Sequence, residues 1–188
     1  MLFVISGPSG SGKSTVLAEV LKDPRVRRVV TATTRAPRPG EVHGKSYWFL
    51  SKKEFAALRD SGGLLEYADN YGCWYGTPRS EVEPKGPAAN AGASPAPQTL
   101  VADLDPQGFR SVRSSGMQVV GIFVAPPSLT VLKDRLVARG TETETQTAIR
   151  LARAASDMAA AAEYDAVVVN DKLEDAVLAV KRHMGLAP

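Results

Sequence analysis

The chain is poor in the residues that form disulfides and metal centres. Its 188 residues include one cysteine, Cys73, and two histidines, His43 and His183. A single cysteine excludes an internal disulfide and any metal site built from cysteine pairs. With so few histidines a zinc site is not expected either. The sequence therefore does not support a disulfide-stapled or zinc-dependent class of protein.

Long apolar runs and dense clusters of one charge are also missing. No apolar stretch approaches the roughly 20 residues that a membrane-spanning helix needs, and a strand-like run begins at Leu2, so we expect no targeting segment. The formal net charge is +3 and the isoelectric point is about 9.1. There is no long lysine or arginine run with interleaved aromatics. We expect a cytoplasmic protein, a monomer or weak homodimer, with neither a membrane nor a nucleic-acid partner.

The pattern of apolar residues indicates a single α/β domain. Hydrophobic residues make up 44% of the chain and charged residues 23%, as in ordinary globular proteins. Strands are predicted at residues 2–5, 28–32, 47–50, 64–68, 100–104, 119–124 and 166–169. Helices are predicted at residues 14–21, 51–59, 106–114, 128–138, 143–162 and 172–184. Alternating strands and helices indicate a mainly parallel sheet with helices on both faces.

Two of these helices carry specific signals. Ser51 and Glu54 have the spacing of a capping box, which starts a helix. Leu129, Leu132 and Leu136 recur on one helical face, and we expect that face to be buried.

The region between residues 33 and 83 breaks the alternation. Its short strands follow one another closely, which predicts a small mixed or antiparallel insert. Residues 84–97 are rich in proline, glycine and alanine and contain no large apolar side chain. Such a segment cannot form a packed core, so we expect a flexible surface loop within one fold.

A glycine-rich segment near the N-terminus is the strongest functional signal. It fits the phosphate-binding pattern G-x-x-x-x-G-K-[ST] at every fixed position, through Gly7, Pro8, Ser9, Gly10, Ser11, Gly12, Lys13 and Ser14, with Thr15 next. A predicted strand precedes it and a predicted helix follows it. Backbone N–H groups and the positive end of the helix can then face phosphate oxygens. Lys13 can reach the β- and γ-phosphates and the Ser14 hydroxyl can ligate Mg²⁺, so we expect ATP binding.

A second cluster looks suited to an acceptor phosphate. Arg35 and Arg38 lie three residues apart in a proline-rich segment and can grip phosphate with forked hydrogen bonds. Tyr47 and Tyr75 offer hydroxyl donors, and Glu66 lies on a predicted strand. Each of these residues alone has an ordinary structural explanation. Together they indicate a pocket for the group that receives a phosphate.

At this point the sequence resembles guanylate kinases nearly end to end. The resemblance rests on six motifs in order: the phosphate-binding loop, residues 33–41 (TTRAPRPGE), 75–77 (YGT), 103–108 (DLDPQG), 125–128 (APPS) and 139–142 (RGTE). It implies a P-loop kinase with a core at residues 1–32, 99–134 and 151–188, a GMP-binding insert at 33–83 and a helical lid at 135–150. Residues 84–98 form a flexible loop, about eight residues longer than the family's usual connection by our count.

The resemblance also implies ligand roles. It implies that the acceptor phosphate is held by Arg35, Arg38, Tyr47 and Tyr75, and that guanine is recognised by Thr31, Glu66, Thr77 and Asp105, with Gly76 beside them. Guanine presents N1–H and the 2-amino group side by side, and one carboxylate can accept both, whereas adenine would leave a buried Glu66 unpaired. Such sites can reject the analogue that lacks the donors by about 10⁴–10⁵-fold.

The remaining residues concern the triphosphate side. Asp103 and Asp105 close a predicted strand at its carboxyl end, where open α/β sheets bind ligands. We expect Asp103 to support Mg²⁺, directly or through water, and Asp105 to serve the acceptor or to cap the helix that follows. By resemblance Arg135, Arg139 and Arg150 are lid arginines that neutralise transferring phosphate, although Arg150 also fits a solvated helix face. Asn170 matches a position near the adenine.

Three other interpretations remain open. The first is a guanylate-kinase-like binding module that has lost catalysis, although the intact Gly12-Lys13-Ser14 motif favours an enzyme. The second is a related P-loop kinase with a ribosyl-phosphate acceptor, which would leave Thr31 and Glu66 without a base to recognise. A nucleic-acid protein has less support than either. We therefore predict a Mg²⁺-dependent transfer from ATP to GMP, and dGMP as a second acceptor.

Overall fold

The computed structural model describes residues 1–70, 72–83, 99–138 and 144–186 of the chain. Two predictions fall largely outside these ranges: the flexible loop at 84–98, and the tip of the lid with Arg139. No helix in the described ranges is long and apolar enough to cross a membrane.

The core is a parallel five-stranded sheet with the strand order β2-β7-β1-β8-β9. The central strand β1 is buried throughout because its run of apolar residues is covered on both faces. The bounds are β1 Leu2–Ser6, β2 Val26–Arg28, β7 Thr99–Asp103, β8 Val119–Ala125 and β9 Ala166–Val169. The carboxyl ends of β1 and β7 therefore meet, and they carry the phosphate-binding loop and Asp103 to the same edge of the sheet.

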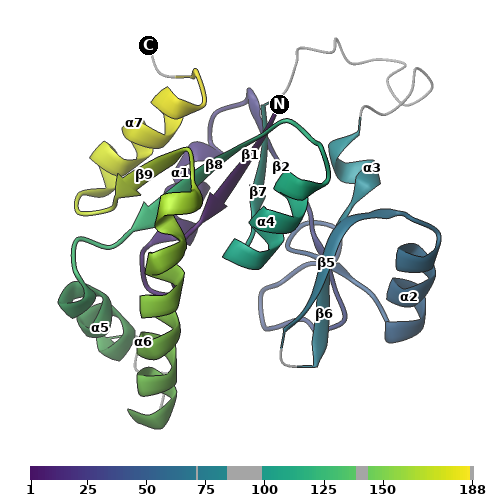
Figure 1. Cartoon of the computed structure of the whole chain (residues 1–188), viewed down its shortest axis with the longest axis horizontal. Helices are drawn as coiled ribbons and strands as arrows, with labels where there is room; N and C mark the ends of the chain where they lie inside the picture. The colour runs from purple at the N-terminus through teal and green to yellow at the C-terminus, as the bar shows by residue number, and fades with distance from the viewer. Residues whose placement is uncertain (71, 84–98, 139–143, 187–188) are drawn as a thin grey trace.

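Helices cover both faces of this sheet (Figure 1). On one face α1 (Lys13–Val20) and α7 (Leu173–His183) pack around Val16, Val20 and Val180. The other face is covered by α4 (Pro106–Ser114) and the 3₁₀ helix η2 (Ala160–Glu163), with the Phe109 and Tyr164 rings stacked 4.1 Å apart. Each fully buried large apolar side chain stabilises the fold by about 1.5–3 kcal/mol.

A separate four-stranded sheet has the order β4-β3-β6-β5 and extends to one side of the core in Figure 1. It is mixed, because β3 (Ala32–Thr33) pairs parallel with β4 (Trp48–Phe49) and antiparallel with β6 (Cys73–Pro78), and β6 pairs antiparallel with β5 (Leu64–Asn70). Phe55 of α2 (Lys52–Asp60) is fully buried against this sheet. The small α3 (Arg79–Val82) leads away from β6.

The α2 capping box is confirmed. The Ser51 hydroxyl accepts from the Glu54 amide at 3.2 Å, and the Glu54 carboxylate accepts from the Ser51 amide at 2.7 Å. On the far side of the core, α5 (Leu129–Ala138) and α6 (Glu144–Ala159) pack together through Leu132 and Ala154. Figure 1 shows this pair and the second sheet extending from the core on opposite sides.

Four sequence-based predictions need correction. The strand predicted at 28–32 is two strands in different sheets, β2 and β3, because the chain leaves the core between them. Leu129 is 52% exposed rather than buried, since it begins α5, whereas Leu132 packs against Ala154 and Leu151 of α6. The predictions also missed β6 as a strand and the short helix α3. Both contain glycine, proline or charged residues that give no periodic apolar signal.

Candidate active site at the carboxyl edge of the core sheet

The phosphate-binding loop wraps a cavity of about 280 Å³ at the start of α1. It is lined by Gly7, Pro8, Ser9, Gly10, Gly12, Lys13, Ser14 and Thr15. Gly12 has a φ of 84°, and an added Cβ would lie 2.2 Å from Nδ2 of Asn170, so only glycine fits this position. The exposed side chains of Ser14 and Thr15 stand at the helix N-terminus, where the dipole favours anions. The geometry suits a phosphate chain.

Ser11 does not line this cavity but anchors the loop. Its backbone carbonyl accepts hydrogen bonds from Nδ2 of Asn170 at 2.8 Å and from Nη1 of Arg135 at 3.3 Å. Nη2 of Arg135 also donates to the Asn170 carbonyl at 3.2 Å. Arg135 and Asn170 border an adjoining cavity of about 430 Å³, together with Asp171 and Leu173. This cavity has room for a nucleoside beside the loop.

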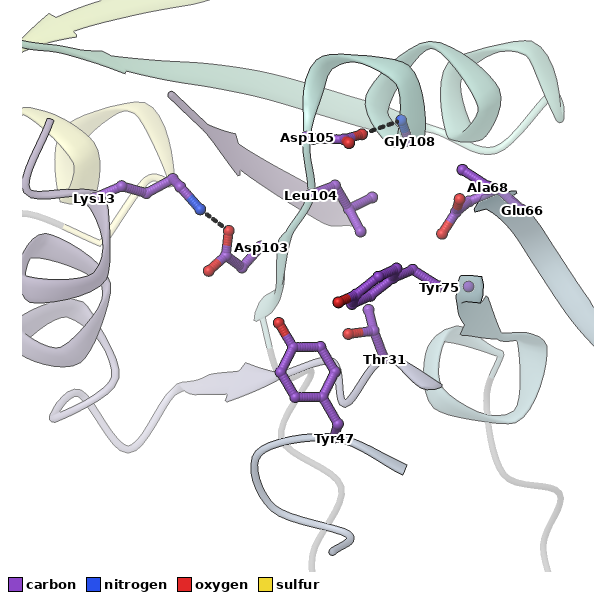
Figure 2. A pocket seen from close by; sticks show the side chains of 11 residues that line it. Lys13, Thr31, Tyr47, Glu66, Ala68, Tyr75, Asp103, Leu104, Asp105 and Gly108 are labelled. Carbon is purple, nitrogen blue, oxygen red and sulfur yellow. Dashed lines mark hydrogen bonds and ion pairs between the residues drawn. The ribbon is translucent and has the colours of Figure 1, made fainter. Parts of the chain in front are cut away.

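Lys13 and Asp103 form an ion pair between the loop and β7. Their side chains are 19% and 23% exposed, so the pair is partly shielded from water. Figure 2 shows the Lys13 ammonium directed at the Asp103 carboxylate, at the edge of a third cavity. The pair therefore lies between the loop and that cavity.

This third cavity, which we call the acceptor cavity, measures about 250 Å³ and lies between the core edge and the second sheet (Figure 2). Seven sequence-predicted residues besides Lys13 line it: Thr31, Tyr47, Glu66, Tyr75, Gly76, Asp103 and Asp105. They come from both sheets, so the fold brings together residues that lie between positions 31 and 105 of the chain. Ala68, Leu104 and Gly108 also line it and were not predicted as site residues.

Glu66 is the buried acid of this cavity. It is 8% exposed and accepts a 2.6 Å hydrogen bond from the Thr77 hydroxyl, which is fully buried behind it. Burial raises the pKa of Glu66 to about 7, and the nearby Asp105 adds to that effect, while the Thr77 hydrogen bonds oppose it. Thr77 thus holds one carboxylate oxygen and leaves the other available to the cavity.

Tyr47 and Tyr75 cross at the opposite side of the cavity, with ring centroids 6.2 Å apart. The Arg35 guanidinium lies over the Tyr47 ring at 5.6 Å, so Arg35 borders the cavity without lining it. Glu41 binds Nη2 of Arg35 with both carboxylate oxygens, at 2.8 and 3.0 Å. This contact raises the pKa of Arg35 and lowers that of Glu41, and the sequence analysis did not single out Glu41.

Asp105 serves the fold as well as the cavity. Its carboxylate accepts a 2.9 Å hydrogen bond from the Gly108 amide and caps α4, one of the two roles expected for it. An added Cβ on Gly108 would lie 3.6 Å from Oε2 of Glu66, an ordinary van der Waals distance, so α4 begins close beside the buried acid. Gly108 follows the helix cap Asp105 by three residues, and this capping spacing is the sequence signal that could have identified Gly108 as a site residue.

One predicted arginine lies away from the cavity, and the side chains of two others fall outside the described residues. The side chain of Arg38 is exposed and outside the cavity lining, and only its backbone amide binds Glu41, at 2.7 Å. Arg150 lies on α6, but its side chain, like all of Arg139, is outside the described part of the chain.

The glycine-rich loop lies at the carboxyl edge of a parallel sheet and faces the cavity that contains the buried Glu66. This arrangement places the chain among P-loop nucleotide-binding α/β proteins. The guanylate kinase family model matches residues 1–186. The chain is 44% identical over 186 residues to a guanylate kinase of Parasynechococcus marenigrum, covering 98% of each chain. It is 41% identical over 182 residues to one of Prochlorococcus marinus, covering 96% of this chain and 95% of the relative.

A solved structure agrees with these relatives. The guanylate kinase of Anaplasma phagocytophilum superposes with a TM-score of 0.74 at 29% identity, covering 98% of this chain and 84% of that one. The chain belongs to the guanylate kinase family.

Proposed function

We propose that this chain is an ATP:GMP phosphotransferase that converts ATP and GMP to ADP and GDP, and that it also accepts dGMP. The observation that carries the proposal is Glu66, a buried carboxylate held by Thr77 in a cavity that begins at Lys13 of the phosphate-binding loop. Guanine offers two adjacent N–H donors to such a carboxylate, and adenine does not. The family membership supports the same reaction.

In the proposed reaction a phosphate oxygen of GMP attacks the γ-phosphorus of ATP in line. The bond from that phosphorus to the bridging oxygen breaks, and ADP leaves with its electron pair. The attacking oxygen is already anionic, so the protein positions the reactants and neutralises charge. Lys13 sits between the two cavities, which suits it to bridge donor and acceptor phosphates. Arg35, Arg135, Arg139 and Arg150 are the other proposed sources of positive charge.

ATP binding would change the partners of Lys13. Triphosphate oxygens offer the ammonium stronger partners than Asp103, so the carboxylate of Asp103 would be released toward the reaction centre. The hydroxyl of Ser14 and this carboxylate are hard oxygen donors, and such a set fits Mg²⁺, which usually takes one or two protein ligands beside phosphates. When bound, Mg²⁺ would supply charge neutralisation on the transferring phosphoryl group.

The other roles follow the division expected from the sequence. We propose that Tyr47, Tyr75, Arg35 and Arg38 hold the acceptor phosphate, and that Thr31, Glu66, Gly76, Thr77 and Asp105 form the guanine side. Asn170 and the loop residues hold ATP. Residues 33–83 act as the acceptor insert and 135–150 as the lid, and closure of both would exclude water from the transfer. A cytoplasmic location fits nucleotide substrates.

An ADP-release assay with GMP, dGMP, AMP, UMP and ribose phosphates as acceptors tests the proposal. We expect GMP and dGMP to support turnover well above the others. Comparable rates with AMP would contradict the assignment of Glu66, and a preference for ribose phosphates would favour the ribosyl-phosphate alternative. Binding of GMP without turnover would favour the non-catalytic module.

A further inference from the structure

Glu81 joins the two places where the chain passes between the core and the second sheet. It lies in α3, directly after β6, on the segment that leaves the second sheet. The segment that enters the second sheet runs from β2 through Val30 to β3. Glu81 is 9% exposed and contacts that segment as well.

Its carboxylate accepts hydrogen bonds from three residues on different segments of the chain. Oε2 accepts from Nη1 of Arg27 in β2 at 3.2 Å and from the Val30 amide at 3.3 Å. Oε1 accepts from Nε1 of Trp48 in β4 at 3.1 Å. The Glu81 backbone carbonyl also accepts from Nη2 of Arg27 at 2.6 Å. One buried carboxylate thus ties the core edge, the entering segment and the second sheet together.

Two of these partners are chain neighbours of cavity residues. Val30 precedes Thr31, and Trp48 follows Tyr47, and both Thr31 and Tyr47 line the acceptor cavity. The Trp48 amide in turn donates to the Thr31 carbonyl at 2.8 Å, so the two neighbours are held in one register. The position of the Thr31 and Tyr47 hydroxyls therefore depends on where Glu81 fixes Val30 and Trp48.

We propose that Glu81 is a positioning residue for the acceptor nucleotide, acting through Val30 and Trp48 on Thr31 and Tyr47. Removing the carboxylate leaves the part-buried Val30 amide, the part-buried Trp48 indole N–H and one side of the Arg27 guanidinium without their acceptor, which is unfavourable. The segment then shifts to find water or other partners. Because the phosphate-binding loop is not part of this network, ATP binding is not affected. This inference rests on the proposed function, in which GMP occupies the cavity.

Steady-state kinetics of Glu81→Ala, Glu81→Gln and Glu83→Ala test the proposal. Glu83 is the matched control, because its side chain is 54% exposed and pairs only loosely with Arg79, at 3.6 Å. We expect Glu81→Ala to raise the KM for GMP about tenfold and to leave the KM for ATP within about twofold. Glu81→Gln keeps one acceptor oxygen, so it should give a smaller rise. Glu83→Ala should change neither constant.

If Glu81→Ala does not fold, Trp48→Phe replaces it in the test. This variant removes the indole N–H that donates to Glu81 and keeps an aromatic ring in the packing. We expect it to raise the KM for GMP about two- to threefold. A lower melting temperature with an unchanged KM for GMP would overturn the inference and leave Glu81 a merely structural residue. A parallel rise of both KM values would overturn it as well. Absence of GMP turnover in the unmodified protein would instead overturn the proposed function, and the inference with it.

Discussion

The hydroxyl of Thr77 donates a 2.6 Å hydrogen bond to Oε1 of Glu66, and burial around this pair raises the pKa of the carboxyl to about 7. The hydrogen bond favours the ionised form, but the loss of solvation outweighs it. Glu66 is therefore poised between an acid and a carboxylate near neutral pH. Only the carboxylate can accept both guanine donors.

We predict that the KM for GMP falls as pH rises through about 7, because ionisation of Glu66 creates the second acceptor oxygen. The phosphate of GMP also titrates, near pH 6. Comparison with Glu66→Gln isolates the ionisation of Glu66, since in that variant only the phosphate of GMP still titrates. Thr77→Val should move the midpoint to higher pH by removing a bond that favours the anion. Identical profiles for all three proteins would contradict this prediction.

Glu66 also makes the free energy of unfolding depend on pH. Its pKa in the folded chain lies above the ordinary value of 4.5, so the folded state holds the proton more tightly than the unfolded state. The stabilising contribution of the protonated Glu66 to the free energy of unfolding is therefore fully present below about pH 4.5 and is lost as pH rises through about 7. Denaturant unfolding of the ligand-free protein should show a smaller loss of stability over this range for Glu66→Gln. Equal slopes would argue against the raised pKa.

Glu66→Gln should relax the choice of base. The amide presents N–H donors where guanine needs an acceptor, which costs about 1–3 kcal/mol at a buried site. The ratio of kcat/KM for GMP to that for AMP should fall accordingly. A ratio equal to that of the unmodified protein would mean that Glu66 does not contact the base.

Arg38→Ala should weaken all mononucleotide acceptors by a similar factor, because a phosphate carries no base identity. In the described structure the Arg38 side chain is exposed, so this prediction requires it to move toward the acceptor when GMP binds. KM values for GMP and AMP are the measurement, because these two acceptors share the phosphate and differ in the base. An unchanged KM for both would show that Arg38 stays outside the site.

Lys13→Ala should lower kcat by at least about 10²-fold, since a charge contact to the transferring phosphate disappears. Lys22→Ala is the control, because the Lys22 side chain is 70% exposed and pairs with Glu19 at 2.7 Å, away from both cavities. Near-normal turnover of Lys13→Ala would favour the non-catalytic alternative.

The sequence predicted the parts of the fold that local signals determine. The glycine pattern, the Ser51–Glu54 capping box and the apolar core strands β1, β7, β8 and β9 depend on signals over a few residues, and each is found close to its expected position. Strand β6 was missed because Gly76 and Pro78 interrupt its pattern, and its pairing with β3 and β5 is set by tertiary contacts.

The site was predicted to a similar extent. Most residues that line the acceptor cavity carry motif signals, but the contacts that orient them do not. Glu41 is the last residue of the TTRAPRPGE motif and Glu81 has no distinctive spacing, but only the folded chain shows that they bind Arg35 and Trp48. The double use of Asp105, as helix cap and cavity wall, was left open for the same reason.

Both tryptophans of the chain belong to the second sheet, Trp48 in β4 and Trp74 in β6. Trp48 lies edge-on to His43 and Trp74 packs beside Phe55, so each indole reports on the packing of that sheet. The core, with its phosphate-binding loop, has none. Tryptophan fluorescence therefore observes the acceptor half of the molecule alone, and it offers an optical signal for GMP that ATP on its own should leave nearly unchanged.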